Sequence, residues 1–81
     1  MYYVYLLESI EDPTRHYVGF TTKDIDFRLK EHNSGNSIHT NKHKPWKCIL
    51  YIAFENRVKA EEFEKYLKHG SGHAFAKKHF W

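Results

Sequence analysis

The chain has 81 residues, 41% of them hydrophobic and 17% aromatic, which suits one compact domain that buries about 60–65% of its unfolded surface. Thirteen lysines and arginines against ten acids give a formal charge of +3 with the histidines neutral, a mild excess that suits a polyanionic partner. The lone cysteine, Cys48, excludes an internal disulfide, and the apolar runs are too short for a bilayer span or signal peptide. We therefore expect a single domain over residues 1–81 in the cytoplasm, with no membrane partner.

The first part of the chain predicts a β-hairpin. Residues Tyr2 to Glu8 alternate and are rich in β-branched and aromatic side chains, and a second short run of this kind extends from His16 to Phe20. The segment from Glu11 to Thr14 lies between them and supplies turn chemistry. Two antiparallel strands joined by a turn are expected.

A helix is expected next. Thr21 with Asp24 three residues later resembles a capping box, and the helix should run to about Asn33, where a Ser-Gly-Asn segment ends it. The polar stretch from Ser34 to Trp46 predicts a loop that is free to move, because a Lys-Pro pair near its end disfavours helix.

The second half predicts a strand and two further helices. The apolar run from Cys48 to Phe54 is long enough for a central strand. Asn56 can cap a helix from about Arg57 to His69, which Gly70 would end.

The last short helix is expected to begin at Ser71 as its cap. Its inward residues would be Ala74, Phe75 and Phe80, and its outward residues Lys77 and Lys78. The whole pattern predicts an α+β fold, a small three-stranded antiparallel sheet flanked by helices in the order β-β-α-β-α-α.

Each of the first two helices carries a charge on a face that should be apolar. In the first, positions i, i+3, i+4 and i+7 are Ile25, Arg28, Leu29 and His32. In the second, one face is formed by Ala60, Phe63, Glu64 and Leu67. Burying a charge is costly unless it is paired or ligates a metal, so Arg28 and Glu64 need partners.

Two explanations for these charges remain open. Arg28 and Glu64 can pair with each other as a structural ion pair that adds little net stability. Alternatively, both faces border a polar cleft, where Glu64 takes a hard cation such as Mg²⁺ and Arg28 takes a phosphate oxygen.

The hairpin brings a second group of candidate residues. Tyr3 and Tyr5 share one face of the first strand, and Tyr17 and Gly19 share one face of the second. If these faces coincide, two phenols converge beside a glycine that leaves room for a phosphodiester backbone, although strand tyrosines are by default packing residues. His32 on the first helix can hydrogen-bond a phenol or assist proton transfer.

These residues occur together in a familiar order. The segments Tyr3-Val4-Tyr5 and Tyr17-Val18-Gly19, followed by Arg28 and then by Glu64 on a later helix, resemble the two-part signature of the GIY-YIG nuclease family. The resemblance covers nearly the whole chain. The tail from Tyr66 to Lys78 looks like that of small stand-alone bacterial members, similar in turn to the Slx-type structure-specific endonucleases.

The resemblance implies a metal-dependent DNA endonuclease that acts in DNA repair or recombination. It implies that Glu64 holds a divalent cation, Mg²⁺ or Mn²⁺, that Arg28 binds the phosphate, and that Tyr5 or Tyr17 activates water as general base. With His32, these residues form the candidate catalytic set. Structured or branched DNA is the implied partner, and a second protein could supply specificity.

Three positions depart from the family pattern. Tyr3 replaces the glycine of the first tripeptide, and Phe20 replaces a lysine that many members carry, with Lys23 as the candidate substitute. Some members use an asparagine in the last helix, and none follows Asn56 here. We therefore expect weak activity or a special substrate as one outcome.

Five lysines are candidate contacts to nucleic acid: Lys23, Lys42, Lys44, Lys77 and Lys78. Three other interpretations stay open. The surface can bind nucleic acid without cleaving it, the chain can be a plain interaction domain, or histidines with i, i+4 spacing (His39 with His43, His69 with His73) can hold zinc.

Overall fold

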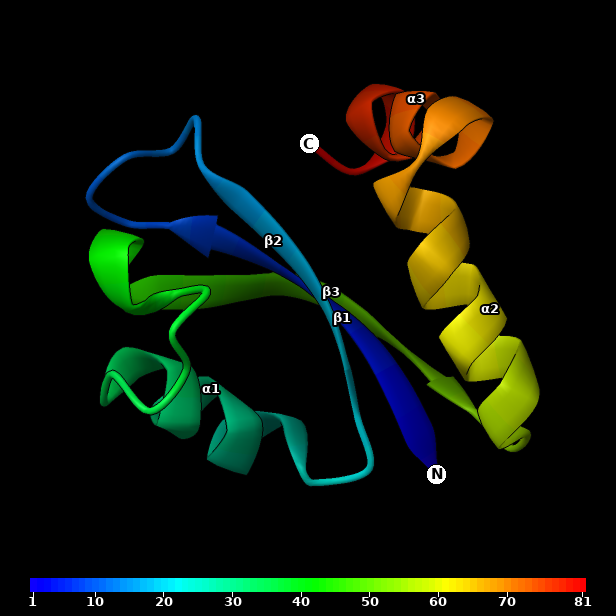
Figure 1. Cartoon of the computed structure of the whole chain (residues 1–81), viewed down its shortest axis with the longest axis horizontal. Helices are drawn as coiled ribbons and strands as arrows, with labels where there is room; N and C mark the ends of the chain where they lie inside the picture. Colours follow the sequence, from blue (N-terminus) through cyan, green and yellow to red (C-terminus); the bar gives the residue numbers. More distant parts are fainter.

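The computed structural model describes all of residues 1–81 and contains three strands, three α-helices and one short 3₁₀ helix. In chain order these are β1 (Tyr2–Ser9), β2 (His16–Thr21), α1 (Ile25–Asn33), η1 (Asn41–His43), β3 (Trp46–Phe54), α2 (Arg57–Lys68) and α3 (Gly70–His79). The expected α+β class and element order are confirmed. Figure 1 shows α1 on one side of the sheet and α2 with α3 on the other.

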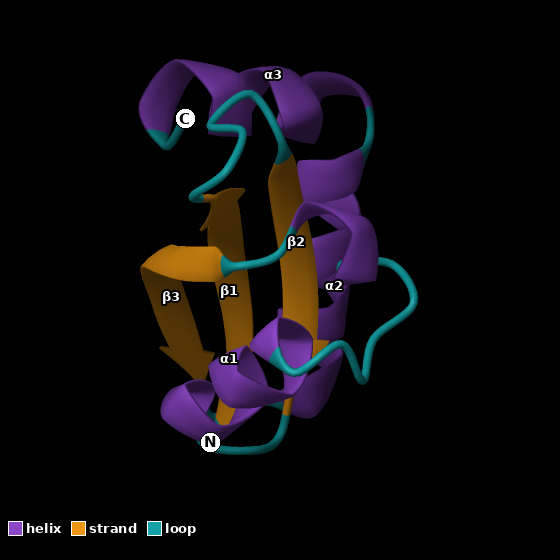
Figure 2. Cartoon of the chain, turned by 90° about the vertical axis from the view of Figure 1, so that its left-hand side faces the viewer, coloured by secondary structure: helices purple, strands orange, loops and turns teal.

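The sheet has the strand order β2-β1-β3, with both neighbours antiparallel to β1. The expectation that the run from Cys48 to Phe54 forms a central strand is wrong: β3 begins earlier, at Trp46, and lies at an edge. The central strand is β1, visible between the other two in Figure 2. Its four consecutive buried residues, Val4 to Leu7, fit that place because both faces of a central strand are covered.

The alternation of β1 divides the interior into two clusters. Val4 and Leu6 pack with residues of α2 and α3, including Leu67 and Ala76. Tyr5 and Leu7 point to the other face and pack with Trp46 and with residues of α1. A strand of period two thus gives one face to α1 and the other to α2 and α3.

Asp24, rather than Thr21, caps α1. The Asp24 side chain accepts from the backbone N–H of Asp26 at 3.2 Å, while the Thr21 hydroxyl accepts from Lys23 N at 3.0 Å in the turn before the helix. The end of α1 at Asn33 agrees with the prediction. Asn56 caps α2 as expected, because its side chain accepts from Lys59 N at 3.1 Å.

The last helix differs from the expectation. It begins at Gly70 without a side-chain cap, so Ser71 lies inside it. Ala74 and Phe75 are exposed, and the packed positions are Gly72, Ala76 and the half-buried Phe80. A Cβ on Gly72 would lie 1.7 Å from the carbonyl oxygen of Tyr66, so only a glycine fits here. The face of α3 that carries Gly72 is therefore the one that packs against α2.

The segment between α1 and β3 is held rather than free. Thr40 is fully buried, and its carbonyl accepts from the Trp46 indole Nε1–H at 2.8 Å. The Ser9 hydroxyl donates to the His43 carbonyl at 2.6 Å. None of the helices is both long enough and apolar enough to cross a membrane.

Candidate active site

Tyr5 and Gly19 lie opposite each other on β1 and β2. A Cβ built on Gly19 would lie 2.3 Å from Cζ and 2.4 Å from Oη of Tyr5. The space above the glycine is therefore filled by the Tyr5 phenol, which corrects the expectation that this space receives a phosphodiester. The two tripeptides depend on each other, because one supplies a ring and the other supplies the room for it.

The Tyr5 hydroxyl is the centre of a buried hydrogen-bond chain. Its oxygen lies 2.7 Å from His32 Nε2 and accepts from Arg28 Nε at 3.2 Å. The other nitrogen of His32, Nδ1, lies 2.7 Å from the Thr40 hydroxyl. Tyr5 is 2% exposed and His32 is fully buried, so this chain fixes the Arg28 side chain from beneath.

Burial sets the protonation of this chain. Desolvation raises the pKa of Tyr5 to about 12, although Arg28 works in the opposite direction. Desolvation, followed by the charge of Arg28, lowers the pKa of His32 to about 4. At neutral pH the phenol is protonated and the imidazole neutral, so Tyr5 donates to Nε2 and Nδ1–H donates to Thr40.

Arg28 does not pair with Glu64. Its Nη1 contacts the Glu31 carboxylate at 3.2 Å, and Glu31 also contacts Lys23 Nζ at 3.1 Å. The hydrogen bond from Lys23, followed by that from Arg28, holds the pKa of Glu31 below its usual range. Since 25% of the Arg28 side chain remains exposed, the guanidinium can still meet an anion from solvent.

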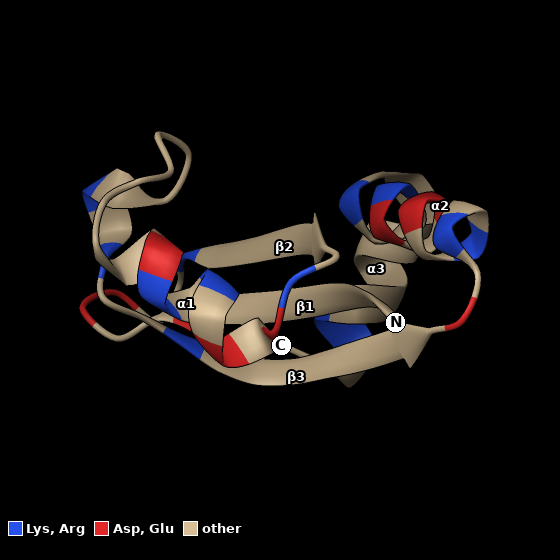
Figure 3. Ribbon diagram, turned by 90° about the horizontal axis from the view of Figure 1, so that it is seen from below, with Lys and Arg blue, Asp and Glu red and all other residues tan.

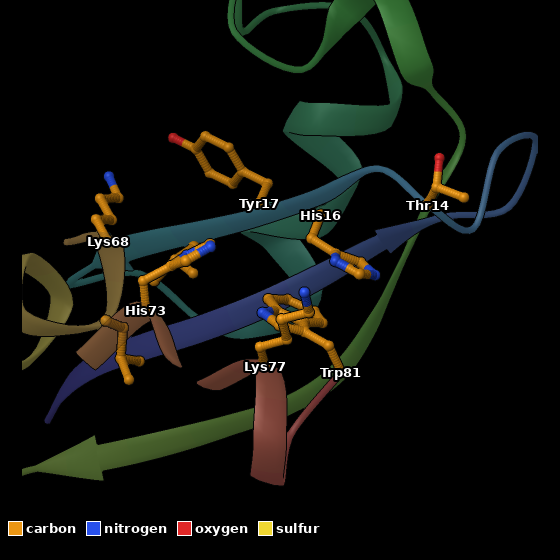
Figure 4. Close-up of a pocket in the computed structure, with 9 residues that line it drawn as sticks. Thr14, His16, Tyr17, Lys68, His73, Lys77 and Trp81 are labelled. Atoms are coloured by element: carbon orange, nitrogen blue, oxygen red, sulfur yellow. The ribbon is translucent and has the colours of Figure 1, made fainter. Parts of the chain in front are cut away.

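Glu64 and Tyr17 are connected through a residue that the sequence interpretation did not single out, Lys68. The Glu64 carboxylate pairs with Lys68 Nζ at 2.5 Å, and the same ammonium lies 5.6 Å from the centroid of the Tyr17 ring. Tyr17 in turn lies beside Tyr5 and His32, with ring centroids 6.4 and 5.2 Å away. Figure 4 shows Tyr17 and Lys68 at the same end of a cavity.

The structure thus gathers the candidate catalytic residues around β2, an edge strand. Tyr5, Arg28 and His32 approach from the α1 side, and Glu64 approaches from α2. The helical faces predicted for these residues agree with the structure, because Arg28 and Glu64 are half-buried and His32 is buried. The structural pair between Arg28 and Glu64 is contradicted, since each has another partner.

The five candidate lysines do not form one patch. Lys23 is paired with Glu31, Lys42 lies in η1, and Lys44 follows it. Lys77 and Lys78 lie on α3 and are exposed, and only Lys77 lines the cavity beside Tyr17. Figure 3 shows basic and acidic segments interleaved along α1 and α2.

The departures from the family pattern also have structural counterparts. Tyr3, in the place of a glycine, packs edge-on against Tyr51 with ring centroids 5.8 Å apart. The Lys23 ammonium joins the Arg28 network through Glu31 and lies 5.1 Å from the Phe27 ring centroid. Neither residue touches the Tyr5 hydroxyl.

No three His, Cys, Asp or Glu side chains come together as a metal-binding group. The histidine pairs considered for zinc therefore lack further ligands. Glu64 offers one half-buried carboxylate, which fits a cation that keeps several waters and takes other ligands from a substrate phosphate, as Mg²⁺ does.

Helical spacing could have found two of the residues that were missed. Lys68 lies four residues after Glu64 and Glu31 three after Arg28, spacings at which opposite charges pair on a helix. Thr40 carried no such signal, because its place under His32 depends on the path of the loop.

Comparison with known proteins identifies the family of the chain. The sequence model of the GIY-YIG catalytic domain matches residues 1–78, and the chain belongs to this family, a class of nuclease domains. The family expected from the two tripeptides is confirmed.

The chain is similar to two kinds of protein, SLX1 endonuclease subunits and small bacterial UPF0213 proteins. It is 37% identical over 75 residues to the structure-specific endonuclease subunit SLX1 of Candida dubliniensis, covering 84% of this chain and 26% of that protein. It is 35% identical over 66 residues to an SLX1 homologue of Giardia intestinalis, covering 76% of this chain and 18% of that protein. An UPF0213 protein of Halalkalibacterium halodurans is 35% identical over 69 residues, covering 84% of this chain and 70% of that protein. The chain therefore spans about a quarter or less of these SLX1 proteins and most of the small bacterial relative.

Proposed function

We propose that residues 1–81 form a metal-dependent DNA endonuclease domain that hydrolyses phosphodiester bonds. The observation that carries the proposal is the grouping of Tyr17, Arg28 and Glu64 around β2, with Tyr5 and His32 buried beneath Arg28. Structured or branched DNA and a protein partner belong to the same proposal, because relatives named as subunits of structure-specific endonucleases share the domain. A role in repair or recombination and a cytoplasmic location complete the proposal.

Tyr17 is the proposed general base. Tyr5 is buried and its pKa is raised to about 12, so it holds its proton and is committed to His32. Tyr17 is half-buried on the edge strand β2, on the same face of the sheet as Tyr5, where an attacking water can reach its oxygen. A phenol can take a proton only as its anion, so the proposal assigns the phenolate form to Tyr17. The water adds to phosphorus, the phenolate takes its proton, and the bond to the 3′ oxygen breaks, a role worth about 10²–10⁴ in rate.

Arg28 is the proposed phosphate ligand. It is held by Tyr5 at Nε and by Glu31 at Nη1, which orients the guanidinium before any substrate binds. Such preorganised charge stabilises the transition state because no reorganisation is needed during the reaction. His32 and Tyr5 act as positioning residues for Arg28.

Glu64 is the proposed ligand of Mg²⁺ or Mn²⁺. A bound cation would act as a Lewis acid on the phosphate and the leaving oxygen. In the described structure the Glu64 carboxylate is paired with Lys68, so this ammonium must turn away when a cation binds. Lys68 has room to turn, because 36% of its side chain is exposed.

The decisive test is Glu64→Gln, which keeps the shape of the side chain and removes its charge. We expect cleavage of a branched DNA in Mg²⁺ to fall below detection, while the melting temperature stays nearly unchanged, since a partly exposed i, i+4 pair contributes only about 0.3–0.5 kcal/mol. The matched control is Glu62→Gln, an exposed acid on the same helix, which should cleave like the wild type.

The same samples separate the enzyme from a plain binding module. A panel of linear, flap and branched DNAs is incubated with and without Mg²⁺, and binding is measured in parallel. Undiminished cleavage by a folded Glu64→Gln variant would refute the metal role. Binding without cleavage of any substrate by the wild type would favour the non-catalytic alternative.

A further inference from the structure

A cavity of about 490 Å³ opens beside Tyr17 on the side away from Arg28, and the roles proposed above leave most of it unused. Tyr17 and Lys68 form one end, and His16 and Trp81 form the other (Figure 4). Its volume lies within the range of about 300–1,000 Å³ that is typical of small-ligand sites. The cavity is thus large enough to hold one part of a substrate whose neighbouring part lies at Tyr17.

The far end of the cavity is an aromatic surface. The rings of His16 and Trp81 are stacked, with centroids 3.9 Å apart and planes only 4° from parallel. The imidazole is also held at its edge, since His16 Nε2 lies 3.5 Å from the Glu8 carboxylate, and 29% of the His16 side chain remains exposed. Stacking covers one face of each ring, which leaves the outer faces of the pair for a further ring. Flat, fixed aromatic surfaces of this kind are where proteins stack nucleobases.

The walls of the cavity are basic. Lys68, His73 and Lys77 line it, and none of the lining residues is an aspartate or glutamate. Three acids contact lining residues, and each also contacts a basic side chain: Glu64 pairs with Lys68, Glu8 contacts both His16 and Lys47, and Asp12 accepts from Thr14 and pairs with Arg15. The positive charge therefore faces an occupant with phosphate groups.

We propose that this cavity binds one unpaired nucleotide next to the scissile phosphate, with its base stacked on the face of Trp81 that His16 does not cover and its phosphate at Lys77. This inference rests on the proposed nuclease function and names a subsite of the same site. A base inside a duplex exposes only its edges, whereas a base must leave the stack to lay its face on an aromatic ring. The subsite therefore selects a nucleotide in a single-stranded arm or at a junction over one in a continuous duplex.

Tryptophan fluorescence gives a direct readout, because the chain has two tryptophans and Trp46 is 3% exposed. We would titrate the protein with single-stranded oligothymidylate in EDTA, so that binding is measured without cleavage. We expect quenching of Trp81 by the oligonucleotide and little quenching by an abasic strand of the same length, which keeps the phosphates and lacks the bases.

The test variant is Trp81→Leu, with binding followed by anisotropy of labelled DNA. We expect about 5- to 150-fold weaker binding of the single strand, the worth of one base-aromatic stack, and unchanged binding of blunt duplex. Trp81→Phe should keep most of the affinity, which excludes a loss through misfolding. The matched control is Phe75→Leu, an exposed aromatic residue on α3 outside the cavity, which should bind like the wild type.

Lys77→Gln should also weaken single-strand binding, whereas Lys65→Gln, an exposed lysine of α2 outside the cavity, should not. Equal binding of the single strand by wild type and Trp81→Leu, or equal quenching by the abasic strand, would overturn the subsite. If one of these two results is found while the wild type still cleaves DNA in Mg²⁺, only the subsite is overturned and the nuclease proposal stands. If the wild type cleaves no DNA in Mg²⁺ but its Trp81 fluorescence is still quenched by the oligonucleotide, the nuclease proposal is overturned and the nucleotide subsite is supported.

Discussion

Gly19 and Tyr5 face each other across β2 and β1, and the ring of Tyr5 occupies the volume that any other side chain at position 19 would need. The same ring carries the hydroxyl that holds Arg28 and His32. A glycine in one strand therefore controls the position of an arginine on a helix, because the intervening phenol has nowhere else to lie.

Gly19→Ala should consequently damage both stability and activity. The new Cβ would displace the Tyr5 ring, and overpacking of this kind costs about 1–3 kcal/mol. Cleavage should fall by more than the loss of folded protein explains, since the Arg28 position shifts with the ring. Urea unfolding and specific activity on one sample check this. Gly70→Ala meets no atom within 4 Å, so its only cost comes from the positive φ of 54°, and its activity should stay normal.

His32 should make stability dependent on pH. Its pKa is lowered from 6.5 to about 4 in the folded chain, so the unfolded chain binds the extra proton between these values. Stability should therefore be complete above about pH 6.5 and fall as the pH drops towards 4, by at most about 3 kcal/mol from this residue. The difference in urea unfolding between wild type and His32→Gln at pH 7, 5 and 4 isolates the contribution. Parallel pH profiles for the two proteins would contradict it.

At the scale of elements, the end of α1 is tied to the start of β3. Asn33 Oδ1 accepts from the backbone N–H of Trp46 at 2.6 Å, and Asn33 Nδ2 donates to the Trp46 carbonyl at 3.0 Å. β3 has no neighbouring strand on the side away from β1, so the Asn33 side chain makes there the two hydrogen bonds that a further strand would make. Because Trp46 also closes over the Thr40 segment, this link holds the loop beneath His32.

Asn33→Ala should loosen this connection. It leaves two backbone groups of Trp46 without partners, and each lost hydrogen bond to a buried group costs about 1–3 kcal/mol. We expect a loss of about 2–4 kcal/mol in urea unfolding. Cleavage per folded molecule should also decline, since Thr40 supports His32. Asn36→Ala, an exposed change in the following loop, should unfold like the wild type.

The elements whose limits could be predicted are those with local signals. Asn56 caps α2 because its side chain reaches the third residue after it, and α1 ends before a glycine with positive φ. The place of β3 at the edge could not be predicted, because the apolar run of seven residues from Cys48 to Phe54 looks the same in a central or an edge strand and only pairing with β1 decides between them. On α3 the expectation was right for Phe80 and wrong for Ala74 and Phe75, because the packed face depends on the close approach of Gly72 to Tyr66 on another helix.

The candidate site was predictable to the extent that periodicity could place its residues. Helical spacing put Arg28 and His32 on one face and strand alternation put Tyr5 above it, and these three share hydrogen bonds. The relation between Tyr17 and Glu64 passes through Lys68 and around the edge of β2, a geometry that spacing along one element does not contain.

At the scale of the whole molecule, charge is mostly balanced locally. Lys23 and Arg28 share Glu31, Arg57 pairs with Glu61, and Lys68 pairs with Glu64. Two segments carry two lysines each and no acid: α3 and the stretch from Ser34 to Pro45. The first lies beyond α2 and the second near α1, so Figure 1 separates them in space. The excess positive charge therefore lies in two separate segments, α3 and the stretch from Ser34 to Pro45, and does not form one continuous basic face.

DNA binding should accordingly be salt-sensitive, with a larger share coming from α3. Each neutralised phosphate adds about −0.9 to the slope of log K against log salt concentration. Replacing Lys77 and Lys78 together by glutamine should reduce the slope by about 1.8, because Lys77 adjoins the cavity that contains Tyr17. Replacing Lys42 and Lys44 together should change it less, since their segment is packed through the Ser9 contact to His43 at the far end of β1. The reverse order would place the DNA along the α1 side of the sheet, and a flat salt response of the wild type would remove nucleic acid as a partner.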